Sequence, residues 1–368
     1  MAQRIYWAPH TLCFLGCLHC HNDSDAEGLP GSAAVVDAVI ANLPDGSSRY
    51  RLEEVLVGGG EPLMAPDLLE RAVRGLRARY PRGPRGLSVD ERRSAGYLVV
   101  AVQTNGLLLA DAAGHLSRER VERWLDLGVD YYHVASGDAF HQSRRPTYPW
   151  DQLFEEMAEV GEVGSCFHVY GKAPARLVPS GRMLDHQRSL AALGAELLTE
   201  RGYCANAWEA ASNWLGADRA YPDCSELVVD EAGQAHPCCW YRLSPAMFDL
   251  TITSFDTGMA AAEKVEALRV LDTGDVIRVG TLAGLNAEVA SAVRDALGDC
   301  GACRLFFARH SARLTPGLAG AVTPISAKEA RYYSSRLRGA GLECLLADLG
   351  LDNPTSEALS EGQIGTSP

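Results

Sequence analysis

The chain has 368 residues, of which 47% are hydrophobic and 22% charged, and its formal net charge is −13. That length can bury one large domain and a smaller one, and the ordinary composition excludes a mostly disordered chain. The negative charge, without a run of lysine and arginine, argues against a nucleic-acid partner or an anionic membrane surface.

The amino-terminal residues hold no apolar run long enough for a signal peptide or a membrane span, so we expect a cytoplasmic protein with no membrane partner. In such a chain, eleven cysteines are expected to act as metal ligands or redox groups rather than as a disulfide framework. Arginines also cluster around a Pro/Gly loop, and we expect them to form a solvated face. They are Arg74, Arg77, Arg79, Arg82 and Arg85.

A first strand is expected over residues 5–10, and it runs directly into three closely spaced cysteines. These are Cys13, Cys17 and Cys20. Their spacing suits three thiolates on one iron–sulfur cluster. A four-iron cluster held by only three cysteines leaves one iron open to a small molecule. A zinc site closed by His19 or His21 is the alternative.

Short apolar runs then alternate with helical patterns, which indicates a parallel α/β architecture. Further strands are expected at residues 54–57, 97–103, 130–135 and 166–170, with a sixth unit between Leu193 and Asn206. Helices are expected to begin at Ser32, at Asp67 with Glu70 as a capping box, and at Ser117, the last of them ending at Gly128. Residues 81–96, rich in Pro, Gly and charge, are expected to be a surface insertion.

Polar and glycine-rich motifs follow the ends of three of these strands. The carboxyl ends of the strands carry the active site in β/α barrels. Glycines leave room for a ligand to approach the backbone, although they could equally serve only to end a strand. For the residues after the fourth strand, a turn with a helix N-cap is the alternative. The motif residues are Gly58, Gly59, Gly60, Glu61 and Pro62, then Thr104, Asn105 and Gly106, then Ser136 and Asp138.

From about residue 216 the pattern changes. Residues 225–230 read as one arm of a hairpin whose return arm runs into Cys238, and Cys300-x-x-Cys303 follows much later. Residues 327–350 read as a closing helix, and the tail over 352–368 lacks periodicity and is expected to be disordered.

The cysteine triplet, the glycine stretch and Thr104-Asn105-Gly106, in this order, resemble the motifs of radical S-adenosylmethionine (SAM) enzymes over about residues 4–210. The resemblance implies a partial (β/α)6 TIM-like barrel with a 4Fe–4S cluster on Cys13, Cys17 and Cys20. It also implies SAM contacts from Gly58, Gly59, Gly60, Glu61, Pro62, Asn105, Ser136, Asp138 and His19. Glu61 could instead form a salt bridge within the fold. His19 stands where the family usually has an aromatic ring packed on adenine.

The cysteines of the second half are similar to the short "twitch" form of the SPASM extension, which binds an auxiliary 4Fe–4S cluster. The implied ligands are Cys224, Cys238, Cys300 and Cys303. Cys239 is the alternative to Cys238, and Cys204 the alternative to Cys224. A structural zinc ion would also suit two cysteine pairs.

The expected organisation has four parts. They are a radical SAM barrel over 1–215, an auxiliary cluster domain over 216–310, a helical segment over 311–351 and the tail over 352–368.

The resemblance implies an enzyme that cleaves SAM to a 5′-deoxyadenosyl radical and takes hydrogen from a small polar metabolite such as a sugar, an aminocyclitol or a nucleoside-like compound. Oxidation, epimerisation or rearrangement of the substrate would follow. Flavodoxin or ferredoxin would be the electron donor, and Cys204 would be a spare thiol that donates hydrogen to the substrate radical. A maturase acting on a ribosomal peptide is the alternative. We expect it less, because the barrel begins near Met1 and leaves no room for a leader-binding domain. The open-iron triplet disfavours a passive iron–sulfur scaffold.

Overall fold

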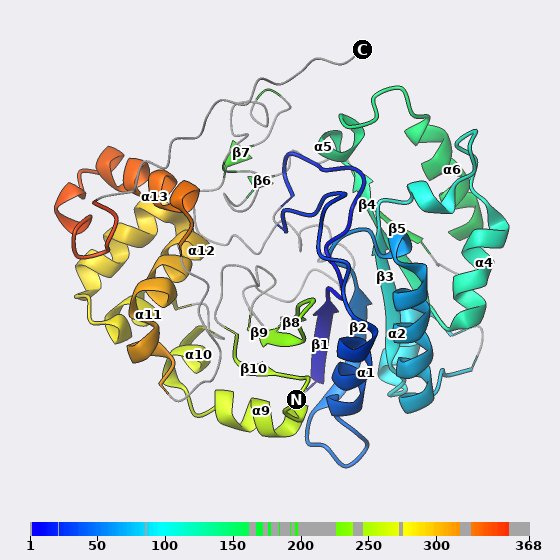
Figure 1. Cartoon of the computed structure of the whole chain (residues 1–368), viewed down its shortest axis with the longest axis horizontal. Helices are drawn as coiled ribbons and strands as arrows, with labels where there is room; N and C mark the ends of the chain where they lie inside the picture. Colours follow the sequence, from blue (N-terminus) through cyan, green and yellow to red (C-terminus); the bar gives the residue numbers. More distant parts are fainter. Residues whose placement is uncertain are drawn as a thin grey trace.

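A computed structural model of the chain is shown in Figure 1. The residues that it describes are 2–20, 22–84, 87–161, 167–171, 176–177, 184, 192, 196–197, 226–237, 246–271, 275–316 and 325–352.

The centre of the molecule is a sheet in the order β10-β9-β8-β1-β2-β3-β4-β5. Its first five strands in the chain lie side by side in chain order, and each pairs in parallel with the next. They are β1 (Ala2–Trp7), β2 (Arg51–Val57), β3 (Val99–Thr104), β4 (Tyr131–Gly137) and β5 (Phe167–Gly171). Parallel strands in chain order, joined by helices, are the arrangement of a β/α barrel. The predicted α/β class with a parallel sheet is therefore confirmed.

Helices cover one face of this sheet, on the right of Figure 1. They are α1 (Ala33–Asn42), α2 (Pro66–Arg79), α4 (Arg118–Leu127) and α6 (Trp150–Gly161). Alternate residues of each strand point toward the helices, since side chains in a strand alternate between its two faces. Val57, Val102 and Val134 are accordingly buried in one core with Val36 and Val73 of the helices.

The predicted helix ends are correct in some places and wrong in one. The Ser117 side chain accepts a hydrogen bond from the amide of Arg120, and Gly128 ends α4, both as predicted. The predicted capping box of Asp67 and Glu70 is absent, because α2 begins earlier, with Ala65 as N-cap and Pro66 as its first residue. Proline fits that position because its missing N–H would have no partner there. Ser32 is the N-cap of α1, without a capping bond from its side chain.

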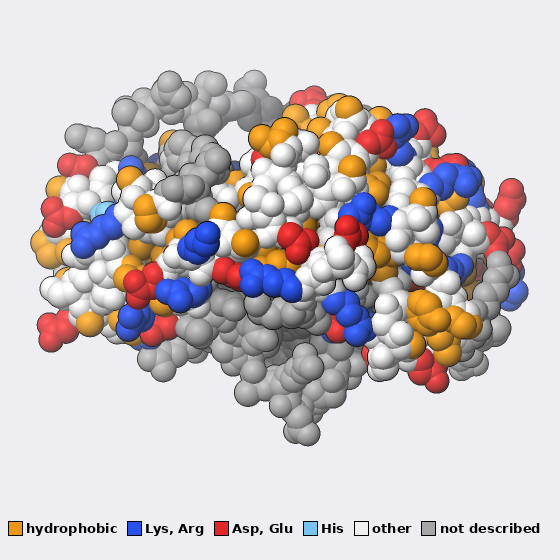
Figure 2. All heavy atoms as spheres, turned by 90° about the horizontal axis from the view of Figure 1, so that it is seen from below, with side chains coloured by type: hydrophobic (Ala, Val, Ile, Leu, Met, Phe, Trp, Pro, Cys, Tyr) orange, Lys and Arg blue, Asp and Glu red, His pale blue; other side chains and the backbone are white. Residues whose placement is uncertain are grey.

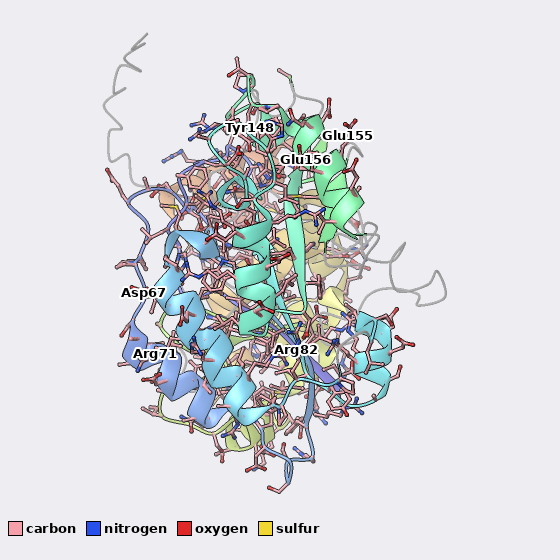
Figure 3. All side chains as sticks on the ribbon, turned by 90° about the vertical axis from the view of Figure 1, so that its right-hand side faces the viewer. Asp67, Arg71, Arg82, Tyr148, Glu155 and Glu156 are labelled. Atoms are coloured by element: carbon pink, nitrogen blue, oxygen red, sulfur yellow. The ribbon has the colours of Figure 1, made fainter. Side chains whose placement is uncertain are left out.

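The expected surface insertion instead contains a short helix, α3 (Val89–Ser94), with buried arginines. The expected solvated arginine face is also wrong in part. The side chain of Arg77 is only 10% exposed and pairs with Asp130, which is 1% exposed. Arg82, labelled in Figure 3, pairs with the same carboxylate at 3.0 Å. A buried carboxylate at the start of β4 thus draws these guanidinium groups inward, whereas Arg74 remains 65% exposed.

The predicted hairpin is confirmed as β8 (Glu226–Val229) and β9 (Gln234–His236). β8 pairs in parallel with β1, so the hairpin extends the main sheet, and β10 (Phe248–Asp249) follows at the edge. β6 (Arg176–Leu177) and β7 (Glu196–Leu197) form a separate pair. The sixth unit expected between residues 193 and 206 thus contributes β7, which lies outside the main sheet, and residues 198–206 are outside the described part of the chain.

The carboxyl-terminal helices form an arc on the left of Figure 1. They are α9 (Phe255–Ala262), α10 (Glu266–Leu271), α11 (Val276–Ala283), α12 (Ala287–Leu314) and α13 (Ala327–Gly339). The predicted closing helix is therefore shorter than expected, and a 3₁₀ turn, η5 (Glu343–Leu345), follows it. The tail beyond residue 352 and the predicted domain boundary at 215–216 lie outside the described residues.

The surface gives no sign of a strongly basic patch on the face drawn in Figure 2, where acidic and basic side chains are mixed over the described residues. Among the described residues, no helix is both long enough and apolar enough to cross a membrane.

Candidate active site

The cysteine loop follows β1 and is closed by its own backbone. The amide of Cys13 donates to the carbonyl of Asp25 at 2.7 Å, and the amide of Cys20 donates to the carbonyl of Cys17 at 3.1 Å. Arg144, beyond β4, donates from Nε to the carbonyl of Leu15 at 3.0 Å. The loop is therefore fastened across the carboxyl end of the sheet.

The three sulfur atoms of this loop lie within electrostatic range of one another. Burial, followed by the negative charges of Cys13 and Cys20, raises the pKa of the Cys17 thiol, which is 5% exposed. Burial likewise raises the pKa of Cys13 to about 11. A bound metal deprotonates coordinating thiols outright. Its positive charge would offset the negative charges of the three thiolates in this buried pocket. The amide of Ser24 already donates to the Sγ of Cys20 at 3.3 Å.

The spacing of the sulfur atoms favours a cluster over a single ion. Thiolates on one tetrahedral zinc ion lie roughly 3.8 Å apart, since each Zn–S bond is about 2.3 Å. Among the described residues, the only set of three candidate ligands within 4.8 Å of one another is His19, Asp138 and His141. At least one pair of sulfur atoms in the cysteine triplet is therefore more than 4.8 Å apart, and the all-sulfur donor set fits an iron–sulfur cluster.

The glycine stretch packs directly against the cysteine loop. The amide of Gly60 donates to the carbonyl of His10 at 3.1 Å, and a Cβ added at Gly60 would lie 2.1 Å from the carbonyl oxygen of Leu12. The carbonyl of Gly59 accepts from Asn22 Nδ2 at 2.9 Å and from Ser24 Oγ at 3.1 Å. The glycines therefore have a structural reason to be present, and the two motifs meet as predicted.

Gly58, the first glycine of that stretch, packs against the side chain of Tyr6. The amide of Gly59 donates to the Tyr6 hydroxyl at 2.6 Å, and a Cβ on Gly58 would lie 2.5 Å from the same oxygen. The phenol of β1 thus fills the space left by the missing side chain.

Glu61 links the loops after β2 and β3. Its Oε1 accepts from the Thr104 hydroxyl at 2.8 Å and from the amide of Leu63 at 3.2 Å, while Oε2 accepts from the amide of Asn105 at 2.8 Å. Burial raises the pKa of Glu61 to about 7. Hydrogen bonds within the fold therefore occupy both oxygens, and Pro62 next to it begins the 3₁₀ turn η1 (Pro62–Met64).

Asn105 carries an orphaned polar atom at the centre of the site. Its Oδ1 accepts from the amide of Leu107 at 3.0 Å. Its Nδ2 is buried and has no hydrogen-bond partner in the described part of the chain. A buried donor without an acceptor is rare in a native protein, so this atom fits a polar group of a bound cofactor.

Beyond β4, Ser136 donates from Oγ to the carbonyl of Asn105 at 2.6 Å. Asp138 caps the short helix α5 (Ala139–Gln142), accepting from the amides of Phe140 and His141, as the N-cap alternative predicts. Burial opposes its ionisation, yet the charge and hydrogen bond of His141, 2.7 Å away, lower the pKa of Asp138 to about 2.

His19 lies against this turn. Its ring centroid is 4.4 Å from that of His141 and 5.3 Å from that of Phe140. His141 is not among the predicted site residues. The signal for it is its position three residues after Asp138 at the start of a helix, where the two side chains share a face.

The predicted auxiliary ligands are described only in part. Cys300 and Cys303 lie on α12, both partly buried and one turn apart, just after a break at Gly298, whose φ of 74° suits glycine. Cys204, Cys224, Cys238 and Cys239 lie outside the described residues, so their predicted roles stay predictions.

Comparison with known proteins identifies the family to which the first half of the chain is similar. The family model described as the radical SAM superfamily matches residues 7–170, from the end of β1 through most of β5. This segment is a radical SAM domain. The predicted family is thereby confirmed, and membership implies a 4Fe–4S cluster and SAM. The match ends before the second half, so the predicted twitch-like extension stays a prediction.

Individual relatives of the radical SAM domain are distant. A probable GTP 3′,8-cyclase of Methanopyrus kandleri is 27% identical over 111 residues, which are 30% of this chain and 29% of that relative. The chain thus matches less than a third of that relative's length. Solved structures with a similar fold include BtrN in complex with AdoMet and 2-DOIA, at 12% identity and a TM-score of 0.45 over 76% of this chain and 90% of that one. A histidine-tagged anSMEcpe with bound AdoMet has 11% identity and a TM-score of 0.43 over 95% and 99%.

Proposed function

We propose that the protein is a radical SAM enzyme whose Cys13, Cys17 and Cys20 hold a 4Fe–4S cluster beside SAM. The observation that carries the proposal is the meeting of the three sulfur atoms with the Glu61 and Asn105 loops at the carboxyl end of the parallel sheet. When bound, such a cluster supplies one electron to the sulfonium of SAM, which yields methionine and a 5′-deoxyadenosyl radical that takes hydrogen from the substrate.

The residues of the chain hold and orient the reactants. The amide of Ser24 supports the Cys20 thiolate, because a hydrogen bond to a charged sulfur stabilises the charge. The unpaired Nδ2 of Asn105 is a donor available to SAM, and the ring of His19, packed beside Phe140, is available to stack on the adenine. Backbone atoms of the glycine stretch, together with Ser136 and Asp138, line the same end of the sheet.

The face of the sheet opposite the helices supports a small polar substrate. Gln103 and His133 are adjacent in register on β3 and β4, and both are partly exposed. They alternate with Val102 and Val134, which are buried against the helices, so they point to the opposite face. An amide and an imidazole together offer hydrogen-bond donors and acceptors of the kind that suit hydroxyl and amine groups. We therefore propose a sugar, an aminocyclitol or a nucleoside-like compound as substrate.

We also propose one auxiliary 4Fe–4S cluster on Cys224, Cys238, Cys300 and Cys303. Its support is the pairing of Cys300 and Cys303 on one face of α12, together with β9, which ends at His236, two residues before Cys238. Anaerobically reconstituted protein should contain about eight irons, from two four-iron clusters. About four irons with bound zinc would remove this part of the proposal.

The central test is cleavage of the cofactor. With SAM and dithionite, or with reduced flavodoxin or ferredoxin, the reconstituted protein should release 5′-deoxyadenosine. Cys17→Ala should abolish the release, whereas Cys344→Ala, which alters an exposed cysteine far along the chain, should leave it unchanged. Wild-type protein with intact clusters and no 5′-deoxyadenosine would refute the proposal.

The substrate class has its own test. A panel of deuterated sugars, aminocyclitols and nucleosides is compared with peptides, and deuterium transfer into 5′-deoxyadenosine is measured. Transfer from a small metabolite that is lost in His133→Ala supports the proposal. Transfer only from a peptide would establish the maturase alternative. For the proposed hydrogen donor, Cys204→Ala should still cleave SAM but fail to complete the product, and unchanged turnover would remove that role.

A further inference from the structure

A buried tyrosine hydroxyl without a partner lies beside the cysteine pair of α12. Tyr333 of α13 is 1% exposed, and its hydroxyl has no hydrogen-bond partner in the part of the chain that the structure describes. A buried hydroxyl is normally paired, so an exception calls for an explanation.

The ring of Tyr333 lies next to the turn between the two cysteines. Its Cε1 atom is 3.7 Å from the position that a Cβ on Gly301 would occupy, and Gly301 directly follows Cys300. Cε1 is bonded to the ring carbon that carries the hydroxyl. The absence of a side chain at Gly301 thus lets the polar edge of the tyrosine approach the backbone of the Cys300–Cys303 turn.

Burial and the neighbouring charges both act on the Tyr333 hydroxyl. Burial, then the negative charge of Glu329, and to a smaller extent that of a Cys300 thiolate, raise the pKa of Tyr333 well above its usual value. The Tyr333 ring lies within electrostatic range of the Cys300 sulfur.

The nearest carboxylate is already engaged. Glu329 accepts from Arg304 Nε at 3.0 Å and from the amide of Ser326 at 2.8 Å, as part of the capping box of α13. Arg304 directly follows Cys303 in the chain, is itself 1% exposed, and is paired with this carboxylate.

We propose that Tyr333 donates a hydrogen bond to the sulfur of Cys300 when that sulfur is a metal-bound thiolate, and that this bond raises the reduction potential of the auxiliary cluster. The inference rests on the auxiliary cluster of the proposed function. A hydrogen bond to a ligating sulfur stabilises the more negative, reduced state of a cluster, and outer groups of this kind tune its potential. Tyr333 thus acts through Cys300 and touches no substrate.

The test is a redox titration of reconstituted Tyr333→Phe, followed by electron paramagnetic resonance under anaerobic conditions. The variant keeps the ring and removes only the hydroxyl, which has no partner among the described residues, so the apoprotein should keep its melting temperature. We expect the midpoint potential of one cluster to become more negative and that of the other to stay unchanged. Tyr332→Phe, the neighbouring residue on the same helix, should change neither potential.

The hydrogen bond of Tyr333 and the auxiliary cluster can be tested separately. Tyr333→Phe protein with about eight irons and both potentials unchanged would overturn the hydrogen bond and leave the auxiliary cluster standing. Wild-type protein with about four irons would overturn the auxiliary cluster and this inference together. A shift in the potential of the cluster held by Cys13, Cys17 and Cys20, identified through its change on addition of SAM, would also contradict the assignment.

Discussion

The amide of Glu61 donates a hydrogen bond to the carbonyl oxygen of Leu12, and nitrogen and oxygen are 2.7 Å apart. This bond joins the loop after β2 to the loop that carries Cys13. Together with the bond from Gly60 to His10, it forms a short ladder between two segments about fifty residues apart in the chain. The positions of the cysteines therefore depend on the backbone of the glycine stretch.

Gly60→Ala should lose the cluster while keeping most of the fold. Its Cβ would lie 2.1 Å from the carbonyl oxygen of Leu12, which is backbone and cannot swing away. We expect reconstituted iron to fall by about four per protein, with little change in far-ultraviolet circular dichroism. Gly339→Ala is the control, because nothing lies within 4 Å of an added Cβ there. Full iron content in Gly60→Ala would contradict this account.

Glu61→Gln should destabilise the loops after β2 and β3. An amide has only one acceptor oxygen for the donors Leu63, Thr104 and Asn105, so at least one buried donor loses its partner. The cost of such a loss is about 1–3 kcal/mol in the free energy of unfolding. Urea unfolding of the apoprotein measures it, and Glu343→Gln, at an exposed position, provides the baseline. Equal stability of the two variants would show that these bonds contribute little.

Asp130→Asn should be among the most damaging single changes in the barrel. The carboxylate is 1% exposed and faces Arg77, Arg82 at 3.0 Å and Arg92 at 3.7 Å. Removing one member of a buried ion pair leaves charge uncompensated and costs about 3–5 kcal/mol. Thermal and urea unfolding measure the effect.

A matched control for Asp130 lies on the surface of α2. Glu70 pairs with Arg74 at 2.8 Å, and the two side chains are 34% and 65% exposed. Glu70→Gln should change stability by no more than about 1 kcal/mol. Similar losses in Asp130→Asn and Glu70→Gln would contradict the role assigned to burial.

The pair of His115 and Glu156 predicts a pH dependence far from the cysteines. His115 Nδ1 is 2.7 Å from Glu156 Oε1, and this hydrogen bond raises the pKa of His115 and lowers that of Glu156 to about 2. Glu156 is labelled on α6 in Figure 3. The contribution of the pair to stability is complete between the ordinary pKa values, 4.5 for Glu156 and 6.5 for His115.

The pair contributes less to stability both above and below that pH range. It fades as the pH rises through the raised pKa of His115, and again as the pH falls toward the lowered pKa of Glu156. A proton NMR titration of His115 should give a midpoint above its ordinary value in the wild type and a lower one in Glu156→Gln. Identical midpoints would show that the pair does not persist in solution.

Local signals predicted much of this fold. The α4 helix follows from Ser117, Gly128 and the apolar spacing between them, and the strands follow from apolar runs that end in turn residues. The α2 start was mispredicted because Pro66 is compatible with a first helical position, so Asp67 lies inside the helix rather than before it.

Long-range relationships were not predictable in this way. Burial of Arg77 depends on Asp130, which lies fifty-three residues away. The turn that brings His141 to His19 depends on how the loops after β1 and β4 meet, and no periodicity encodes that meeting. The order of the motifs indicated which loops would lie close together. The hydrogen bonds and ring contacts that join these loops could be identified only in the structure.

The parallel pairing of β8 with β1 makes the carboxyl-terminal half an integral part of the catalytic scaffold. The amide of Ala8, five residues before Cys13, donates to the carbonyl of Val229 on β8 at 2.8 Å. Exchange of the distal half between related proteins would strip this partner from the first strand. Chimeras should therefore succeed when the junction lies beyond β9, so that the hairpin travels with the amino-terminal half, and fail when the junction lies between β5 and β8.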